Sequence, residues 1–358
     1  MMPMILSHER HRLLVQCLAE RAQPLARSRR FTLYSLGPGS DAGGIDDIIL
    51  VHDFAPGEID NNIASYVADE LLPLLFASFL REGNADDCGA SEQDLFERLV
   101  GEIVRSIDGN EERAWHLFYD NTLAALDRAG QRDGDAESKT RPPNDFIAEF
   151  ATIYRRVADL AAECRPASVL DVATCFGFLP LLLVSALSPQ PKGCWQNPRV
   201  VGCDLNPALI ALANSYARQR RLAGVCFVEA DIRDAFHPAL PQQSFDVVTA
   251  IHLLEHLEPT ETALAMDRLW HLARRRLIVA VPVEAVPDPR FGHRQVFDRE
   301  SLSALGRTTG GHCRSFEDHG AWLVIDREQM DPEQMDPEQI DQEQGATHTH
   351  HRIEGAWT

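Results

Sequence analysis

A regular alternation of short apolar runs with helical segments between Asp145 and Arg327 most constrains how this chain folds. Five runs are almost continuously apolar, as strands buried on both faces are: SVLDV, VVGCD, VCFVE, FDVVTAI and RLIVAV. Helical patterns lie between them, near 178–187, 207–221 and 260–273, and HCRSFEDHGAWLVID predicts a closing hairpin. We therefore predict an α/β fold, a doubly wound and mainly parallel sheet with a C-terminal antiparallel hairpin, whose ligands bind at the carboxyl ends of the strands.

Composition divides the chain into four segments. Residues 1–130 are predicted to form a smaller α+β accessory domain, with strands in RRFTLYSL and DDIILVHDF and helices near 59–80, 91–107 and 111–128. Residues 131–144 are polar, contain a proline pair and predict a linker to the α/β domain at 145–327. Residues 328–358 begin with the acidic near-repeat EQMDP and contain few apolar residues, which predicts a disordered acidic tail.

Charge and cysteine use exclude several classes of protein. The formal net charge is −20, from 54 acidic and 34 basic side chains, so we expect neither nucleic acid nor a membrane as a partner. The eight cysteines never form C-x-x-C, which argues against a disulfide framework or structural zinc. No signal peptide is recognisable and the apolar runs are too short to span a bilayer, so we expect a cytoplasmic protein.

Acidic residues end or follow three successive predicted strands. Asp171 ends the first and precedes a turn into a helix, where backbone N–H groups face a ligand. Asp204 ends the second, where a carboxylate accepts hydrogen bonds from the ribose hydroxyls of an unphosphorylated adenosine. It follows Gly177 by 27 residues instead of roughly 20, because the loop SPQPKGCWQNP intervenes. Asp231 is placed to accept from an adenine amine while Ile232 packs against the ring.

This order of motifs, continued by FDVVTAIHLLEHL, resembles the class I S-adenosylmethionine-dependent methyltransferases over about residues 145–327. The resemblance implies a Rossmann-like fold and S-adenosyl-L-methionine as the cofactor. It places the turn and the strand before it around the methionine moiety, and the next two strand ends around the adenosine. The cofactor-binding residues that it implies are Asp171, Ala173, Cys175, Gly177, Asp204, Leu205, Asp231 and Ile232.

The turn departs from the family pattern. The family turn is usually D-x-G-x-G-x-G, whereas this chain has Asp171-Val172-Ala173-Thr174-Cys175-Phe176-Gly177 and keeps only the third glycine. A Cβ atom costs energy wherever the backbone needs a positive φ angle. Either the turn takes a variant conformation or it binds the cofactor more weakly, and a catalytically degenerate binding protein is the alternative to an enzyme.

Several longer phrases are similar to the methyltransferases of the mycofactocin system: FYDNTL, DVATCFGFLPLLL, IHLLEHLEP, VAVPVE, FGHRQVFD and DHGAWLVIDR. That family is associated with O-methylation of the oligoglucose chain on a peptide-derived redox cofactor. The resemblance implies that the methyl group is transferred to a sugar hydroxyl of a small-molecule or glycosylated acceptor. Methyl transfer to another small-molecule hydroxyl or to an acid is the alternative.

Histidines are the candidates for removing the acceptor proton, because their ordinary pKa lies near neutrality. His252 follows the fourth predicted strand, below the expected methyl position, and is the leading candidate for the catalytic base. His293 follows the fifth strand on the acceptor side and is the second, with Arg294 as a hydroxyl donor and Glu284 as a weaker candidate. His256 is expected to have a packing role and not a catalytic one.

Two other enzyme classes share fragments of these motifs. His252 to His256 spells H-x-x-E-H, the pattern of a zinc-peptidase family. A buried strand precedes it and Pro259 follows closely, which leaves no room for the long helix of a peptidase. A metal-assisted methyltransferase that uses Glu255 and His256 is a further alternative, but no metal ligand is predicted. A nicotinamide-dependent dehydrogenase needs G-x-G-x-x-G after the first strand, and Ala173 and Cys175 interrupt that pattern.

Overall fold

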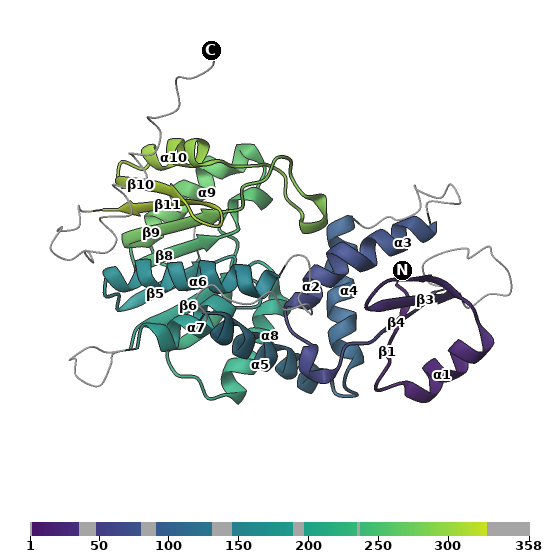
Figure 1. The fold of residues 1–358 in the computed structure, drawn as a ribbon. Helices are drawn as coiled ribbons and strands as arrows, with labels where there is room; N and C mark the ends of the chain where they lie inside the picture. The colour runs from purple at the N-terminus through teal and green to yellow at the C-terminus, as the bar shows by residue number, and fades with distance from the viewer. Residues whose placement is uncertain are drawn as a thin grey trace, which may run out of the picture.

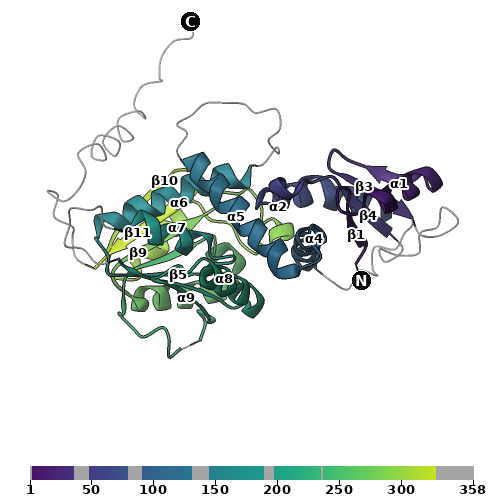
Figure 2. The ribbon, with the colours of Figure 1, turned by 90° about the horizontal axis from the view of Figure 1, so that it is seen from below.

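A computed structural model describes residues 2–35, 48–79, 91–130, 145–188, 197–234 and 237–327. Two sheets lie at opposite ends of an elongated molecule, with helices between them in both views (Figure 1, Figure 2). The predicted linker at 131–144 and the predicted tail at 328–358 lie outside the described residues. No helix within the described ranges combines the length and apolar character needed to cross a bilayer.

The larger sheet has seven strands in the order β10-β11-β9-β8-β5-β6-β7. Five adjacent strands run parallel to one another: β5 (Ser168–Val172), β6 (Arg199–Asp204), β7 (Val225–Glu229), β8 (Phe245–Ile251) and β9 (Ala273–Val281). The hairpin of β10 (His312–Glu317) and β11 (Ala321–Asp326) adds to β9 in antiparallel orientation. The predicted α/β fold with a C-terminal hairpin is therefore confirmed.

Helices cover both faces of this sheet because successive strand residues point to opposite faces. Val169 and Val247 pack with α6 (Phe146–Glu163) and α7 (Phe178–Ala186) on one face. Leu170 and Val248 pack with α9 (Pro259–Leu272) and α10 (Arg299–Arg307) on the other. The sequence analysis did not place α6 or α10. Helix α6 begins where the predicted linker ends, and the side chain of Asp145 caps it by accepting a hydrogen bond from the Ala148 N–H.

The smaller sheet has the order β1-β4-β3-β2. Its two central strands, β3 (Phe31–Ser35) and β4 (Ile48–His52), were predicted and are antiparallel. The outer strands β1 (Met4–Ser7) and β2 (Pro24–Arg27), and α1 (Arg12–Arg21) between them, were not predicted. The remaining N-terminal elements are η2 (Pro56–Glu58), α2 (Asn62–Tyr66), the π-helical η3 (Val67–Leu71), α3 (Leu72–Phe79), α4 (Glu92–Ser106) and α5 (Glu111–Gly130).

Helix α5 joins the N-terminal helices to the larger sheet. The rings of Tyr119 on α5 and Tyr216 on α8 (Pro207–Gln219) stack with centroids 4.6 Å apart. The Tyr119 hydroxyl donates to the Phe176 carbonyl over 2.8 Å, and the Tyr216 hydroxyl donates to Asp120 over 2.8 Å. One hydrophobic cluster runs from the smaller sheet through α4 and α5 to Phe227 of the larger sheet. The apolar packing thus continues across the predicted boundary at residue 130.

Candidate active site

The turn after β5 keeps a left-handed backbone at three alternate positions. The φ angles are 59° at Ala173, 51° at Cys175 and 76° at Gly177. These are the positions that glycine occupies in the D-x-G-x-G-x-G pattern, so the conformation persists although two of the glycines are replaced. A left-handed backbone costs a non-glycine residue roughly 1–2 kcal/mol. Such strain typically gathers at functional sites.

Hydrogen bonds and one steric constraint hold the turn. The Thr174 N–H donates to the Cys203 carbonyl over 3.0 Å, and the Cys175 N–H donates to the Asp204 carboxylate over 2.9 Å. A Cβ atom at Gly177 would lie 2.4 Å from the Phe227 ring. Gly177 is therefore required both because a side chain there would clash with Phe227 and because its φ angle is positive. Ala173 and Cys175 carry Cβ atoms, so no such clash excludes a side chain at those two positions.

Two carboxylates lie at the ends of the central strands. Asp171 is buried and accepts a 2.6 Å hydrogen bond from the Thr249 hydroxyl, and burial raises its pKa to about 6. The two oxygens of Asp204 accept from the N–H groups of Cys175 and Asn206, each over 2.9 Å. Burial also raises the pKa of Asp204, while these backbone hydrogen bonds lower it. Each Asp204 oxygen still has a lone pair for a further donor.

Asp231 has a partner that the sequence analysis missed. Arg233 donates to both carboxylate oxygens of Asp231, from Nε over 3.0 and 3.1 Å and from Nη2 over 2.7 Å. It also reaches Glu261 over 3.1 Å. The hydrogen bonds from Arg233 hold the pKa of Asp231 below its ordinary value. The Asp-x-Arg spacing was the available signal, since a planar guanidinium pairs with a carboxylate through two parallel hydrogen bonds.

Two adjoining cavities meet at this edge of the sheet. The first, which we call the strand-end cavity, has a volume of about 300 Å³ and is lined by Asp204, Leu205, Asp231 and Ile232. The second, the aromatic cavity, has a volume of about 360 Å³. It takes its name from Phe96, Phe146, Phe150, Tyr154, Phe176, Phe178 and Phe291. Both cavities are lined in part by Gln93, Ala173 and His256, so they adjoin.

The structure distributes the predicted residues between these cavities. Asp171, Cys175, His252, Glu284 and His293 line the aromatic cavity, whereas Gly177 lines neither and acts within the turn. Arg294, expected beside His293 on the acceptor side, instead lines the strand-end cavity and pairs with Glu258. The N-terminal half of the chain contributes residues to the aromatic cavity that the sequence analysis did not single out: Asn61, Ala64, Gln93, Phe96 and Glu97.

His252 is held in an unusual conformation at the end of β8. Its φ angle is 54°, and its N–H donates to the Ala280 carbonyl of β9 over 2.8 Å. The imidazole packs 5.4 Å from the Phe150 ring, and its Nδ1 lies 4.0 Å from Glu255. Burial, reinforced by the charges of His293 and His256, lowers the pKa of His252 to about 3.

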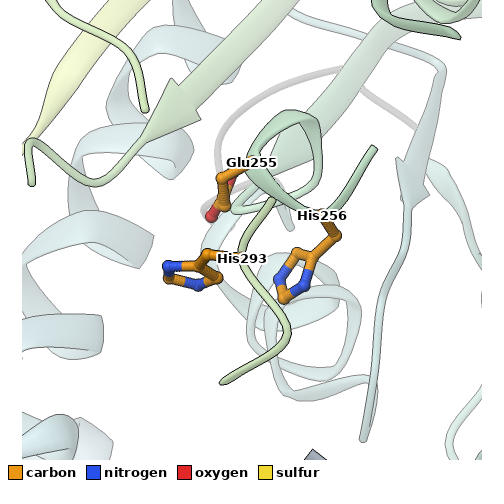
Figure 3. Close-up of side chains that lie close together, drawn as sticks. All are labelled: Glu255, His256 and His293. Carbon is orange, nitrogen blue, oxygen red and sulfur yellow. The ribbon is translucent and has the colours of Figure 1, made fainter. Parts of the chain in front are cut away.

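A second histidine group lies beside it, on η5 (Leu254–His256) and the loop after η6 (Pro289–Phe291). His293 Nδ1 lies 2.8 Å from a carboxylate oxygen of Glu284. The rings of His293 and His256 are perpendicular, with centroids 4.9 Å apart. Figure 3 shows Glu255 above the two imidazoles. Burial raises the pKa of Glu255 to about 8 and lowers that of His256 to about 4.

Comparisons with known proteins agree with this geometry. Residues 169–275 match a family described as "Methyltransferase domain". Demethylmenaquinone methyltransferase of Thermus thermophilus is 36% identical over 160 residues, which cover 44% of this chain and 66% of that protein. The chain thus spans slightly less than two thirds of the curated relative that it matches.

Solved structures of low sequence identity are also similar. Magnesium protoporphyrin IX methyltransferase of Synechocystis, with bound SAH, matches with a TM-score of 0.39 and 15% sequence identity. The match covers 61% of this chain and 100% of the Synechocystis chain. An O-methyltransferase family protein of Burkholderia thailandensis matches with a TM-score of 0.43 and 13% sequence identity. This match covers 77% of this chain and 95% of the Burkholderia chain. The family match and the curated relative, together with the observed sheet, support a class I methyltransferase domain in this chain.

Proposed function

We propose that the protein is an S-adenosylmethionine-dependent methyltransferase that transfers the methyl group to the oxygen of a sugar hydroxyl. The observation that carries the proposal is the turn after β5, which keeps all three left-handed positions and directs the Cys175 N–H onto Asp204. Glycines are absent at two positions, yet the backbone at all three glycine positions of the motif is left-handed, the conformation that glycine adopts without steric cost. A degenerate relative has no need to maintain that strain.

The chain's own residues provide a compartment for each part of the cofactor, which is S-adenosylmethionine. In the strand-end cavity, the free lone pairs of Asp204 suit the two ribose hydroxyls, and Asp231 with Ile232 suits adenine. Arg233 keeps Asp231 ionised and oriented. The methionine moiety is assigned to the turn of Ala173, Cys175 and Gly177 and to Asp171 beneath it. When bound, the cofactor supplies a methyl group on a cationic sulfur.

The aromatic cavity is assigned to the acceptor. Phenylalanine rings pack against the C–H faces of sugars, and the adjacent histidines and Glu284 offer hydrogen bonds to hydroxyls. The resemblance to the mycofactocin methyltransferases supports an oligoglucose chain as the acceptor. A phenolic hydroxyl is the second candidate, because the same cavity is rich in aromatic side chains.

His252 is assigned the role of accepting the acceptor proton: burial holds its pKa at about 3, so the imidazole is neutral at pH 7 and has a free nitrogen, although it is a weaker base than an exposed histidine. It lines the aromatic cavity at the end of β8, and its strained backbone is fixed by the hydrogen bond to Ala280. The acceptor O–H proton passes to the imidazole while the oxygen attacks the methyl carbon. The carbon–sulfur bond breaks and its electron pair stays on sulfur, giving S-adenosylhomocysteine.

Calorimetric titration tests the cofactor assignment. The protein should bind S-adenosylmethionine and S-adenosylhomocysteine saturably and should not respond to NAD. Asp204→Ala should abolish both titrations, because it removes the acceptor for the ribose and for the Cys175 N–H, while far-UV circular dichroism stays unchanged. Tight residual binding by this variant would remove Asp204 from the cofactor site. A response to NAD alone would overturn the proposed function.

Replacement of His252 tests the base. Asn tolerates a left-handed backbone, so His252→Asn preserves the turn into η5 while removing the basic nitrogen. We expect unchanged affinity for S-adenosylhomocysteine and a fall in turnover of about 10²–10⁴-fold. Near-normal turnover would assign proton removal to another group.

Mass spectrometry with matched acceptors identifies the acceptor class. Oligoglucosides and simple phenols, each incubated with protein and S-adenosylmethionine, should be compared for the mass gain of one methyl group in place of hydrogen. Methylation of the oligoglucosides supports the proposal. Methylation of the phenols alone would favour the second candidate.

A further inference from the structure

A group of potential metal ligands lies between the two cavities. Glu255, His256 and His293 each offer one ligand atom, and these atoms all lie within 4.8 Å of one another. Figure 3 shows the three side chains side by side, with Glu255 and His256 on η5 and His293 on a separate loop. His256 lines both cavities and His293 lines the aromatic one. The group therefore borders the space assigned to the acceptor.

Glu255 gives an independent indication of a ligand. Its side chain is 1% exposed, and neither carboxylate oxygen accepts a hydrogen bond from another described residue. His252 Nδ1 lies 4.0 Å from a Glu255 carboxylate oxygen, which is beyond hydrogen-bond reach. Burying a carboxylate without a partner is costly, and native structures nearly always supply one. A cation beside Glu255 resolves this deficit.

The His293 imidazole is arranged as metal-binding histidines usually are. His293 Nδ1 is engaged by Glu284 over 2.8 Å, which leaves Nε2 for another partner. The backbone of Gly292 lies beside the His256 ring. Metal-ligating histidines typically use one ring nitrogen for the metal and the other for a carboxylate or carbonyl. His293 follows that arrangement.

The loop that carries His293 is fixed to η5. The Arg294 N–H donates to the Glu255 carbonyl over 2.7 Å. The Gln295 side chain donates to the carbonyls of Leu254 and Leu257 over 3.0 and 2.9 Å, and to the Thr262 hydroxyl over 2.7 Å. These contacts hold the third ligand beside the first two, so the group is built into the tertiary structure.

We propose that Glu255, His256 and His293 bind a divalent transition-metal ion. Two imidazoles and one carboxylate favour zinc, manganese, iron or cobalt over magnesium and calcium, which prefer oxygen ligands. Metal–ligand bonds of about 2.1 Å bridge atoms up to roughly 4.2 Å apart. The observed limit of 4.8 Å therefore requires only small side-chain rotations. The sequence analysis predicted no metal, and the third ligand lies too far along the chain for a local motif to include it.

The role of the ion deepens the proposed function and rests on it. With three protein ligands, the ion keeps open positions toward the aromatic cavity, where it would bind the acceptor hydroxyl oxygen. Coordination lowers the pKa of a bound hydroxyl. The proton then passes more easily to His252, which lines the same cavity. This predicts that the preferred acceptor presents an oxygen able to ligate a metal.

Metal titration of the full chain, stripped with a chelator and free of cofactor and acceptor, tests the site directly. Cobalt(II) is the probe, followed by calorimetry and by its visible absorption bands. We expect one equivalent to bind, and Glu255→Gln to weaken binding more than about 100-fold, since loss of a mere supporting group already costs 10–100-fold. His293→Ala should give the same loss and provides a second variant should Glu255→Gln fail to fold.

The C-terminal sequence THTHHR needs its own control, because it could bind cobalt adventitiously. Replacing His348, His350 and His351 with alanine should leave the one-equivalent site intact. Retained binding in Glu255→Gln and His293→Ala, with loss in the tail variant, would overturn the inference. Absence of cobalt binding would also overturn it.

Titration of the same samples with S-adenosylhomocysteine separates this inference from the proposed function. Binding of S-adenosylhomocysteine without cobalt binding rejects the metal site alone. Binding of cobalt without S-adenosylhomocysteine binding supports the metal site and rejects the methyltransferase function. Both results therefore remain interpretable whichever statement fails.

Discussion

Three non-glycine residues with a left-handed backbone gather at the carboxyl ends of β5 and β8: Ala173, Cys175 and His252. Each lines at least one of the two cavities. Two occupy positions where related turns have glycine, and the third follows the central strand. At the scale of single residues, the strain lies where the cofactor and acceptor are proposed to meet, which links the conformational cost to function.

Ala173→Gly should therefore stabilise the protein. Glycine adopts the 59° φ angle without steric cost, and this gain exceeds the entropy that glycine adds to the unfolded chain. We expect the free energy of unfolding to rise by about 0.5–1 kcal/mol. Affinity for S-adenosylhomocysteine should be equal or higher, because the methyl group leaves the cavity wall. Urea denaturation and calorimetry measure the two effects.

Ala211→Gly is the matched control. Ala211 is exposed on α8, where the backbone is helical, so the same substitution should lower the free energy of unfolding by up to about 1 kcal/mol. Opposite signs at the two positions are the expected result. A loss of stability at both would show that Ala173 is not strained.

At the scale of elements, α4 links the smaller sheet to the site. Gln93, Phe96 and Glu97 lie three or four residues apart on one face of α4 and line the aromatic cavity. Its other end approaches β4, where His52 Nε2 lies 2.7 Å from the Ser106 hydroxyl. Ser106 donates its own proton to the Ile103 carbonyl over 2.7 Å, so His52 must supply the proton of this hydrogen bond.

The burial of His52 makes the contact between β4 and α4 sensitive to acid, because the buried imidazole resists a second proton. His52 is fully buried, and burial, with the charges of Arg30 and His11, lowers its pKa to about 3. The unfolded chain binds this proton below about pH 6.5 while the folded chain does not, so stability falls as the pH falls between about 6.5 and 3. The slope attributable to His52 approaches about 1.4 kcal/mol per pH unit.

His52→Gln tests this assignment because glutamine keeps a donor for Ser106 and does not titrate. Urea denaturation at a series of pH values should show a shallower acid dependence for the variant than for the unaltered protein. For each protein, the free energy of unfolding at pH 7 is the reference for its own pH series. Parallel curves would show that other groups account for the loss of stability in acid.

At the scale of the whole molecule, the hydrophobic packing is continuous from one sheet to the other. The cluster contains Leu33 and Ile48 of the smaller sheet, Phe118 of α5 and Phe178 of α7. Residues 1–130 are proposed as an accessory domain, but their core is shared with the larger sheet. We therefore expect one cooperative unfolding transition for the described part of the chain.

Hydrogen exchange along a urea series measures this directly. Peptides from β3 and β4 should lose protection at the same urea concentration as peptides from β8 and β9. Deleting the residues after Arg327 should leave both midpoints unchanged, because that segment offers few apolar groups to bury. Earlier loss in β3 and β4 would instead establish the N-terminal region as an independently folding domain.

The sequence by itself determined the larger sheet and the sheet edge at which the candidate cofactor residues lie. Continuous apolar runs predict buried parallel strands, and the residues that end them, such as Asp171 and Asp204, necessarily meet at one sheet edge. Elements without such a signature were missed: β1 and β2 are short outer strands, and α6 and α10 adjoin polar segments. The apolar pattern of a sequence predicts a strand well where the strand is buried on both faces, because every residue must then be apolar. It predicts edge strands and surface helices poorly.

Tertiary structure decided the rest. The turn that contains Ala173 and Cys175 is held by hydrogen bonds to Cys203 and Asp204 of another strand. The sequence alone therefore left open whether the turn takes a variant conformation or binds the cofactor more weakly. Likewise, no spacing rule brings His293 beside Glu255, or α4 over the aromatic cavity. Contacts between residues distant in the chain carry no local periodicity, and only the packed molecule specifies them.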